Sequence, residues 1–110
     1  GSTLYIGGSF TQAGGQPRNR FAALSLANGN ATTLNPNLNG TVNAVALAQN
    51  RILMGGDFTQ AGNQTRNRLA SIDATSGALE AWNPDANGSV NALLVDGQNV
   101  YVGGSFQNVG

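Results

Sequence analysis

The chain of 110 residues contains no cysteine, histidine or lysine, and only 9% of its residues are charged. The absence of cysteine excludes disulfides, zinc-finger spacings and thiol nucleophiles. The absence of histidine excludes Ser-His-Asp and Cys-His arrangements, and the absence of lysine excludes a Schiff base. Carboxylates remain, but no spacing indicates a pair of them across a cleft. We therefore expect no enzymatic activity and no cofactor.

An excess of charge of one sign is also missing. Five arginines balance four aspartates and Glu80, so the net charge is zero and no basic face can neutralise phosphates. No stretch approaches the roughly 20 apolar residues of a membrane span. No charged segment followed by an apolar one opens the chain, so a secretory signal is absent or already removed. The sequence predicts neither nucleic-acid binding nor membrane insertion.

Asparagine, glutamine, serine and threonine supply the polarity instead, with fifteen asparagines among them. Neutral polar surfaces of this kind are typical of secreted and cell-surface repeat proteins, so we expect one of these two locations. Four Asn-x-Ser/Thr sequons, which a eukaryotic secretory pathway would glycosylate, occur at Asn30, Asn39, Asn63 and Asn87. A composition so rich in asparagine, threonine and serine also produces sequons by chance.

What the chain does contain is a repeat of 48 residues. Residues 55–62 read Gly-Gly-Asp-Phe-Thr-Gln-Ala-Gly, residues 7–14 repeat them with serine for aspartate, and residues 103–110 form a diverged third copy. Aligning residues 3–50 on residues 51–98 without gaps gives twenty identities. Internal repeats of this period indicate stacked structural units. They predict a first repeat, a second repeat and the start of a third, at residues 1–50, 51–98 and 99–110.

Each period predicts four short strands separated by turns. Runs of strand composition cover residues 42–47, 52–58, 68–73 and 78–82, and a polar loop covers residues 59–65. No segment keeps an apolar period of 3.6 residues over three turns, which argues against helices. The predicted fold is therefore all-β, with β-propeller blades of four antiparallel strands. The first blade would lack its innermost strand at the N-terminus.

The motifs resemble those of a known family. Two glycines followed by Asp or Ser, Phe and Thr, then Arg-Asn-Arg, Trp-Asn-Pro and Asn-Gly-[Ser/Thr]-Val-Asn-Ala, are similar to the bacterial "delta sixty" repeat β-propellers. They resemble as well the propeller of fungal cell-cortex polarity markers and, more distantly, kelch and WD-repeat blades. The resemblance covers the whole chain. It implies secreted or surface-anchored proteins with adhesion or scaffolding roles and no shared catalytic residues.

Closure of a propeller needs more blades than this chain holds. Propellers close with roughly four to eight blades, and the chain contains little more than two. Open apolar edges and faces favour association, so the chain is a piece of a longer array, a protomer of a ring or a subunit of a head-to-tail fibre. Its partners are then copies of itself or flanking repeats, and its function is that of a scaffold or adhesin. The alternative is a carbohydrate-binding propeller with one shallow glycan site per blade.

The candidate binding residues are two repeated triplets and one tryptophan: Arg18, Asn19, Arg20, Arg66, Asn67, Arg68 and Trp82. The triplets either hold loop carbonyls and turns or bind sugars or acidic groups along one rim. The tryptophan either packs between blades with its indole N–H satisfied or forms a platform on which a sugar stacks. The residues alone leave both pairs of alternatives open.

Four further polar residues have structural interpretations. Asn43 and Asn91 lie within apolar strands, so we expect buried amides that bond the backbone between blades. Asp57 and Asp73 are expected to form ion pairs with the arginines of the second triplet, or turn hydrogen bonds. The alternative is a ligand carboxylate or a metal site, against which the first repeat has serine at both positions. No Asp-x-Asp-x-Asp-Gly calcium loop is present, so no metal site is predicted. The double glycine of each repeat would let a neighbouring strand approach closely.

Overall fold

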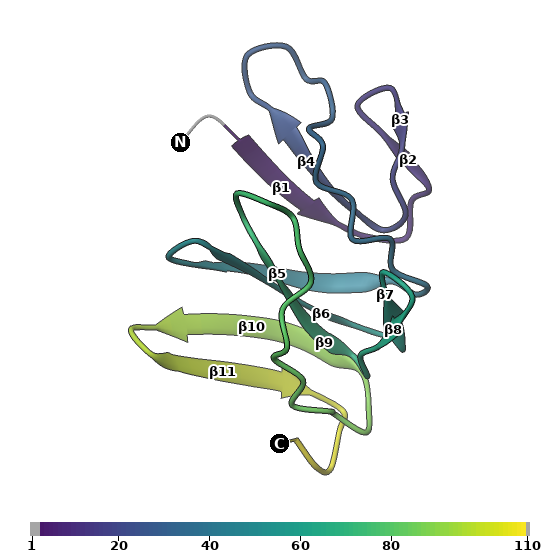
Figure 1. Ribbon diagram of the computed structural model, residues 1–110. Helices are drawn as coiled ribbons and strands as arrows, with labels where there is room; N and C mark the ends of the chain where they lie inside the picture. The colour runs from purple at the N-terminus through teal and green to yellow at the C-terminus, as the bar shows by residue number, and fades with distance from the viewer. Residues whose placement is uncertain (1–2, 110) are drawn as a thin grey trace.

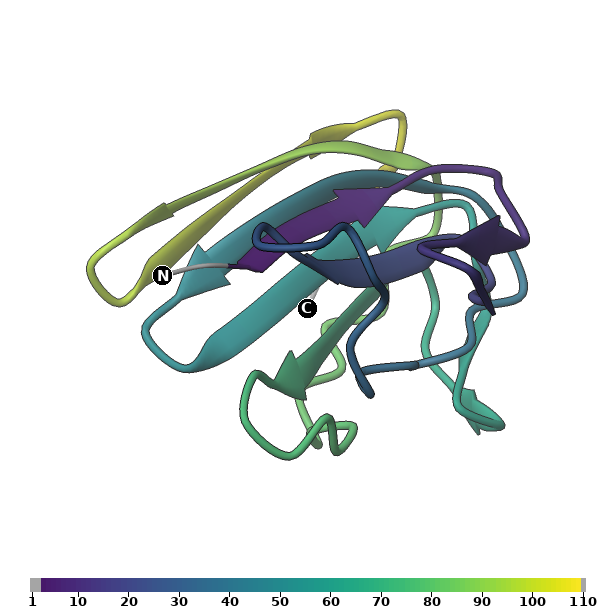
Figure 2. The same ribbon diagram turned by 90° about the horizontal axis from the view of Figure 1, so that it is seen from above.

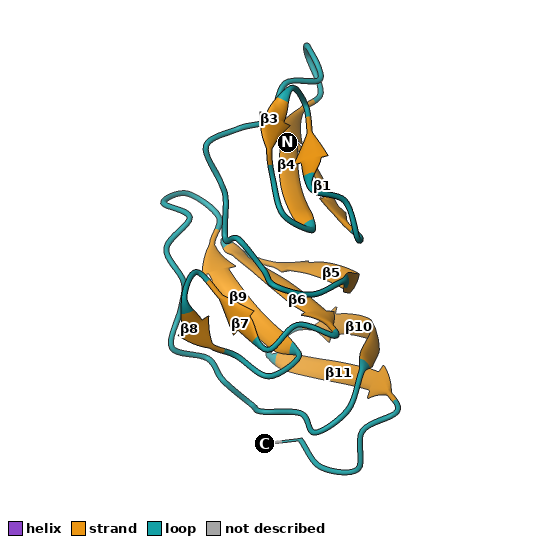
Figure 3. Ribbon diagram, turned by 90° about the vertical axis from the view of Figure 1, so that its right-hand side faces the viewer, coloured by secondary structure: helices purple, strands orange, loops and turns teal. Residues whose placement is uncertain are grey.

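The computed structural model describes residues 3–109, and every regular element within that range is a β-strand (Figure 3). The prediction of an all-β fold is therefore confirmed. The described residues include no helix with the length and hydropathy of a membrane span. The strands are β1 (Thr3–Gly7), β2 (Gln12–Ala13), β3 (Gln16–Pro17), β4 (Phe21–Ser25), β5 (Val42–Ala48), β6 (Arg51–Gly56), β7 (Gln60–Ala61), β8 (Gln64–Thr65), β9 (Leu69–Asp73), β10 (Val90–Asp96) and β11 (Asn99–Gly104).

Three main antiparallel sheets follow one another along the chain (Figure 1). β1 pairs with β4, β5–β6–β9 form the middle sheet, and β10 pairs with β11. The sheets pack against one another in chain order, because β5 contacts both β1 and β10. Seen from above, the axes of their strands are roughly aligned, with neighbouring strands in a sheet pointing in opposite directions (Figure 2). Since β5 precedes residue 50 and β6 follows it, the middle sheet takes strands from both sequence repeats.

The middle sheet has the strand order that one period of the sequence predicts. Ile52 of β6 pairs with Leu47 of β5 on one side and with Ile72 of β9 on the other. A strand with neighbours on both edges and both faces is shielded from water on all sides. Residues 52–56 of β6 are accordingly all buried. This burial explains why β6 is continuously apolar instead of alternating.

The predicted fourth strand, residues 78–82, is reduced to a single bridge between Leu79 and Ile72. Beyond this bridge the chain leaves the sheet, and the Trp82 side chain packs against a buried cluster that includes Val90 of β10. Burial of part of a large aromatic side chain offsets the loss of one or two further ladder bonds. The prediction of a continuous fourth strand is therefore wrong.

The polar segment 59–65, predicted as a loop, forms a small hairpin instead. β7 and β8 pair through two residues each, and the turn residues Gly62 and Asn63 have positive φ values of 55° and 70°, as tight hairpin turns require. Ala61 anchors the hairpin because it is fully buried and bridged to Leu38. A ladder of two residues per strand is too short for apolar periodicity to indicate.

Two apolar clusters fill the spaces between the sheets. The larger, between the β1–β4 pair and the middle sheet, includes Phe21, Met54 and Phe58, all 0% exposed. The smaller, between the middle sheet and the β10–β11 pair, is built on Leu69 and Val90. Full burial of one such side chain stabilises the fold by about 1.5–3 kcal/mol. Packing between sheets is thus the main stabilising contribution, as a propeller requires.

Candidate functional site

The first arginine of each triplet connects a small hairpin to the segment that follows the last strand of its sheet, β4 for Arg18 and β9 for Arg66. Arg18 donates to the carbonyl oxygens of Pro17 and Thr32, at 2.7 Å each. Arg66 makes the same two bonds one repeat later, at 2.7 and 3.0 Å. A guanidinium has five donors in a rigid plane, which suits it to bridging two carbonyls. Both arginines therefore hold loop carbonyls.

The other two residues of each triplet face the segment between consecutive sheets. Arg20 and Arg68 have positive φ values of 70° and 67°. Each donates from Nη1 to a carbonyl 18 residues further along the chain, at 3.3 Å. Asn19 donates to the side-chain oxygen of Asn37 at 2.7 Å, and its repeat equivalent donates to Asp85 at the same distance. The triplet thus binds the connection to the next sheet.

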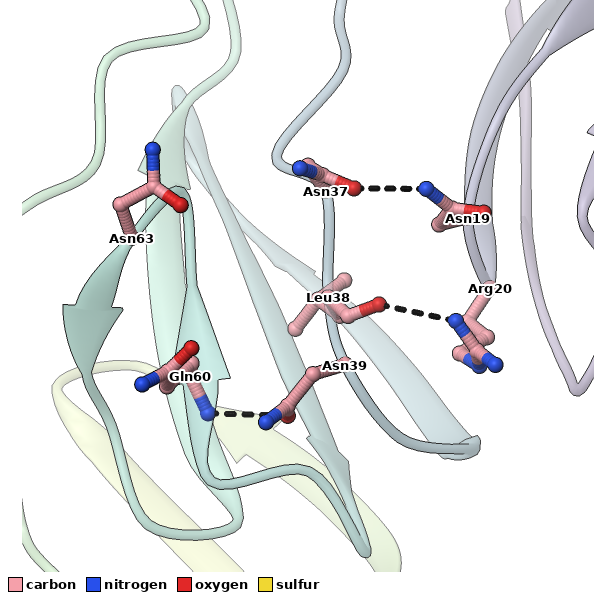
Figure 4. Close-up of a pocket in the computed structure, with 7 residues that line it drawn as sticks. All are labelled: Asn19, Arg20, Asn37, Leu38, Asn39, Gln60 and Asn63. Atoms are coloured by element: carbon pink, nitrogen blue, oxygen red, sulfur yellow. Dashed lines mark hydrogen bonds between the residues drawn. The ribbon is translucent and has the colours of Figure 1, made fainter.

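A polar cavity of about 230 Å³ lies where these contacts meet the β7–β8 hairpin (Figure 4). One wall comes from the first triplet, one from the connection between β4 and β5, and one from the hairpin. Its lining residues are Asn19, Arg20, Asn37, Leu38, Asn39, Gln60 and Asn63. The cavity therefore joins two neighbouring sheets and three segments that are distant in the sequence.

Several amide groups of this cavity have unused hydrogen-bonding capacity. Both polar atoms of the Asn39 side chain are occupied by the β7 segment. In contrast, no hydrogen bond within residues 3–109 is recorded for the side-chain amides of Gln60 and Asn63, or for Asn37 Nδ2. Amides both donate and accept, as the hydroxyl groups of a ligand do. The lining therefore presents exposed amide donors and acceptors without a protein partner among the described residues.

Among the residues that the structure describes, the cavity carries a single charged side chain, that of Arg20. The equivalent place in the second repeat differs, because Asp85 stands where the first repeat has Asn37. That carboxylate would repel an anionic group. The cavity and its equivalent in the second repeat therefore have corresponding backbone positions but different charges.

The structure brings only part of the predicted set into this cavity. Asn19 and Arg20 line it, while Arg18 and Arg66 are engaged with carbonyls outside it. The sequence did not indicate Asn37, Leu38 or Gln60 as site residues. The remaining two lining residues, Asn39 and Asn63, were predicted only as sequons. The one signal for the missed asparagine is its place next to the repeated Asn-Pro pair, which marks a turn between sheets.

Trp82 lies apart from the cavity and has a packing environment. Its ring packs against the cluster of Leu69 and Val90, and the guanidinium carbon of Arg51 lies 5.9 Å from the ring centroid. Arg51 also forms the one ion pair among the described residues, with Glu80 at 2.7 Å. The ring contacts agree with the packing interpretation of the tryptophan, but within residues 3–109 its indole N–H forms no hydrogen bond to the protein.

Glu80 sits in a small hydrogen-bonded network on the middle sheet. Its Oε1 accepts from Arg51 Nε and from the hydroxyl of Ser71, both at 2.7 Å. Ser71 is fully buried. Burial of the carboxylate raises the pKa of Glu80, but the hydrogen bonds and the charge of Arg51 outweigh it, so this pKa lies below its ordinary value. The carboxylate is held in its ionised form.

The predicted ion pairs of Asp57 and Asp73 with the second triplet are not formed. Asp73 accepts the backbone N–H groups of Ser76 and Thr75 at 2.9 and 2.8 Å, which lower its pKa, so the alternative of turn hydrogen bonds is confirmed. Asp57 bonds the hydroxyl of Ser89 on the connection to the next sheet. Arg66 and Arg68 donate instead to the carbonyl oxygens of Thr65, Glu80 and Ala86.

Asn43 bonds the backbone between sheets as predicted, through a donation to Val90 O at 3.1 Å. Both Asn43 and Asn91 are exposed, however, so the expectation that they are buried is wrong: the innermost strands present these side chains away from the apolar clusters. All four sequon asparagines are exposed as well. Their glycosylation stays a prediction.

The small stacked sheets, joined by interlocking loops, define a β-propeller protein. A family model described as the Rax2 C-terminal beta propeller domain matches residues 1–99. The chain belongs to this family, which bears out the resemblance to propellers of fungal cortical markers. No curated protein and no solved structure matches the chain.

Proposed function

We propose that the chain is a non-enzymatic repeat unit, secreted or held at the cell surface, that associates with further copies of the same repeat as a scaffold or adhesin. The observation that carries the proposal is the difference between the middle sheet and the outer ones. β6 has a hydrogen-bonded neighbour on each side, whereas within the described residues β1 pairs only with β4 and β11 only with β10. The outer strands expose edges that a strand of the same kind would complete.

Exposed apolar side chains on the outer sheets support the same proposal. Leu4 on β1 is 48% exposed, Leu94 on β10 64% and Tyr101 on β11 54%. Leu53 of β6, the repeat equivalent of Tyr101, is fully buried. Covering a side chain of this size stabilises by about 1.5–3 kcal/mol, and a chain this small buries little surface by itself. Association with further repeats supplies the missing burial.

The proposed contact joins different surfaces of the two partners. A surface that resembles the start of the chain would lie against one that resembles its end, so the contact is heterologous and gives a ring or a fibre depending on the rotation per unit. As part of this proposal, the chain is of the bacterial "delta sixty" repeat type. The repeated Gly-Gly-[Asp/Ser]-Phe-Thr motif supports that assignment.

Size-exclusion chromatography with light scattering tests the proposal on the natural chain. We expect a mass that is a multiple of the 11.2 kDa of one chain. The variant Leu94→Lys places a charge on the exposed face and should shift the population towards monomer. Leu26→Lys is the matched control, because Leu26 is 61% exposed but lies in the turn after β4. A natural chain that is a stable monomer would remove the proposal.

A second candidate function is carbohydrate binding, which the amide-lined cavity favours. Its free amides and single arginine suit a neutral glycan, and repetition in an assembly would add avidity to a weak site. The test is a glycan array probed with the assembled form. An array without any bound glycan would exclude this candidate and leave the scaffold proposal intact.

A further inference from the structure

The face of the β10–β11 sheet that points away from the rest of the molecule is uncovered. We define this open face by Ala92, Leu94, Tyr101 and Gly103, which form two directly opposed cross-strand pairs. All four residues are exposed. The equivalent positions on the middle sheet are covered by β10, and of these Leu53 and Gly55 are buried. The middle sheet therefore shows that a face of this kind is covered by the innermost strand of the next sheet.

A valine fills the place above the glycine wherever the face is covered. A Cβ atom added to Gly55 would overlap the Val90 side chain, and one added to Gly7 would stand 2.5 Å from Val42 Cγ1. Each of these two glycines leaves a space where a side chain would stand. The first residue of the next innermost strand fills this space. At Gly103 the nearest atom to an added Cβ is the Ala92 Cβ at 3.7 Å, an ordinary contact within the same sheet.

Val90, which fills the space above Gly55, is also bound through its carbonyl oxygen. Asn43 Nδ2 on β5 donates to Val90 O at 3.1 Å, so one residue of β10 is bound by a glycine hole and by an amide donor of the preceding sheet. Asn91 is the repeat equivalent of Asn43 and is exposed. Within residues 3–109 its Nδ2 has no recorded acceptor, although its Oδ1 accepts from Asn43 at 3.4 Å.

We propose that Gly103 and Asn91 form a socket for the valine that opens the innermost strand of a further repeat of this type. The occupant is a strand that reads Gly-[Ser/Thr]-Val-Asn-Ala, as both β5 and β10 do. Its valine side chain fills the space above Gly103, and its valine carbonyl accepts from Asn91. The inference rests on the proposed function and adds the surface, the occupant and the direction of the contact.

The chemistry of the socket selects the occupant. A hole left by a missing Cβ is shallow, so a β-branched side chain with a methyl group close to the backbone fills it best, and a longer side chain would hold the strands apart. The amide donor requires the carbonyl of that same residue, which fixes the register of the incoming strand. The socket lies at the β10–β11 end of the stack and therefore determines how a further repeat is added at that end.

The test compares the natural chain with a chain extended by one period. Gly110 falls on Gly62 in the repeat, so residues 63–110 are copied after residue 110 to supply an innermost strand with its valine in phase. The variant Gly103→Val fills the socket in both chains. We expect the urea midpoint of the natural chain, measured at a concentration at which it is monomeric, to be unchanged, because an added side chain meets open space. We expect the midpoint of the extended chain to fall towards that of the natural one.

Two further variants keep the outcome unambiguous. Gly55→Val should lower the midpoint in both chains, because that place is already filled by Val90. Asn91→Ala removes the donor without adding bulk and should lower the midpoint of the extended chain more than that of the natural one. Equal effects of Gly103→Val in both lengths, or an extended chain no more stable than the natural one, would overturn the socket. Self-association of the natural chain is measured separately, so failure of the socket and failure of the assembly proposal are distinguishable.

Discussion

Asn39 and Thr59 are joined by two reciprocal hydrogen bonds across the boundary between two sheets. The Asn39 Oδ1 accepts the backbone N–H of Thr59 at 2.9 Å, and its Nδ2 donates to the Thr59 hydroxyl at 3.1 Å. The same oxygen also accepts the N–H of Gln60 at 3.0 Å. Asn87 repeats the two backbone bonds with Gln107 and Asn108, at 2.7 and 3.0 Å. One asparagine per repeat thus locks each connection onto the following sheet.

Removal of this lock should destabilise the chain. Asn39→Ala leaves two exposed backbone N–H groups without their protein acceptor, and we expect a loss of about 0.5–1.5 kcal/mol in the free energy of unfolding. Asn39→Asp keeps the acceptor and should cost clearly less, while Thr59→Val removes only the hydroxyl bond. Urea denaturation measures all three. An alanine variant as stable as the natural chain would contradict the role of the amide.

The glycines that follow these asparagines, Gly40 and Gly88, should not tolerate a side chain. A Cβ on Gly40 would stand 2.8 Å from Phe58 Cα, and one on Gly88 would stand 2.7 Å from Phe106 Cα. These contacts are with backbone atoms, which cannot rotate away. We expect Gly40→Ala and Gly88→Ala each to cost about 1–3 kcal/mol through overpacking. Thermal unfolding measures the loss, with Gly103→Ala as a neutral control that has no such neighbour.

The strands of the middle sheet could be predicted because their apolar composition and the repeat give independent evidence for them. β9 lies within a predicted strand, and β5 and β6 each extend one residue beyond theirs. The β7–β8 hairpin could not be predicted, since Ala61 is its single fully buried residue and its backbone bonds leave no pattern in the side chains. The length of the fourth strand was overestimated, because the sequence pattern around Trp82 does not distinguish a residue paired in a sheet from one packed over it.

The candidate site was predictable only where the repeat marks it. Asn19 and Arg20 recur and were found; Asn37 is replaced by aspartate in the second repeat and was missed. Gln60 reaches the cavity from a hairpin 40 residues away from Arg20, a proximity created by packing between sheets. Repetition in a sequence records the contacts that every unit needs, and it is less informative about a place where two units differ.

Stability should decrease in acid because of Glu80. A carboxyl whose pKa is lower in the folded than in the unfolded chain contributes stability that is present above the unfolded pKa, about 4.3, and is lost as the pH falls through the folded pKa. We expect a constant urea midpoint from neutral pH to about pH 5 and a decline below it. Glu80→Gln should lower the midpoint at pH 7 and flatten the decline.

Part of the acid sensitivity should survive in that variant. The backbone N–H groups of Ser76 and Thr75 lower the pKa of Asp73, so this carboxylate contributes with the same sign. Asp96→Asn, at the exposed β10–β11 turn, is the control for a general change of charge. An unchanged slope for Glu80→Gln would show that the network of Arg51 and Ser71 does not stabilise the ionised carboxylate.

Glycan binding, if the cavity provides it, should depend on the two turn asparagines. Asn37 and Asn63 have positive φ values of 58° and 70°, so glycine can replace each of them without backbone strain while removing its amide. Each substitution should weaken the binding of a neutral glycan about 2- to 10-fold, the effect of one lost hydrogen bond. Gln49→Gly is the matched control, because Gln49 also has a positive φ, of 55°, and lies at the distant β5–β6 turn. Titration calorimetry with the strongest glycan of the array measures the change, and equal affinities for all three variants would place the glycan elsewhere on the molecule.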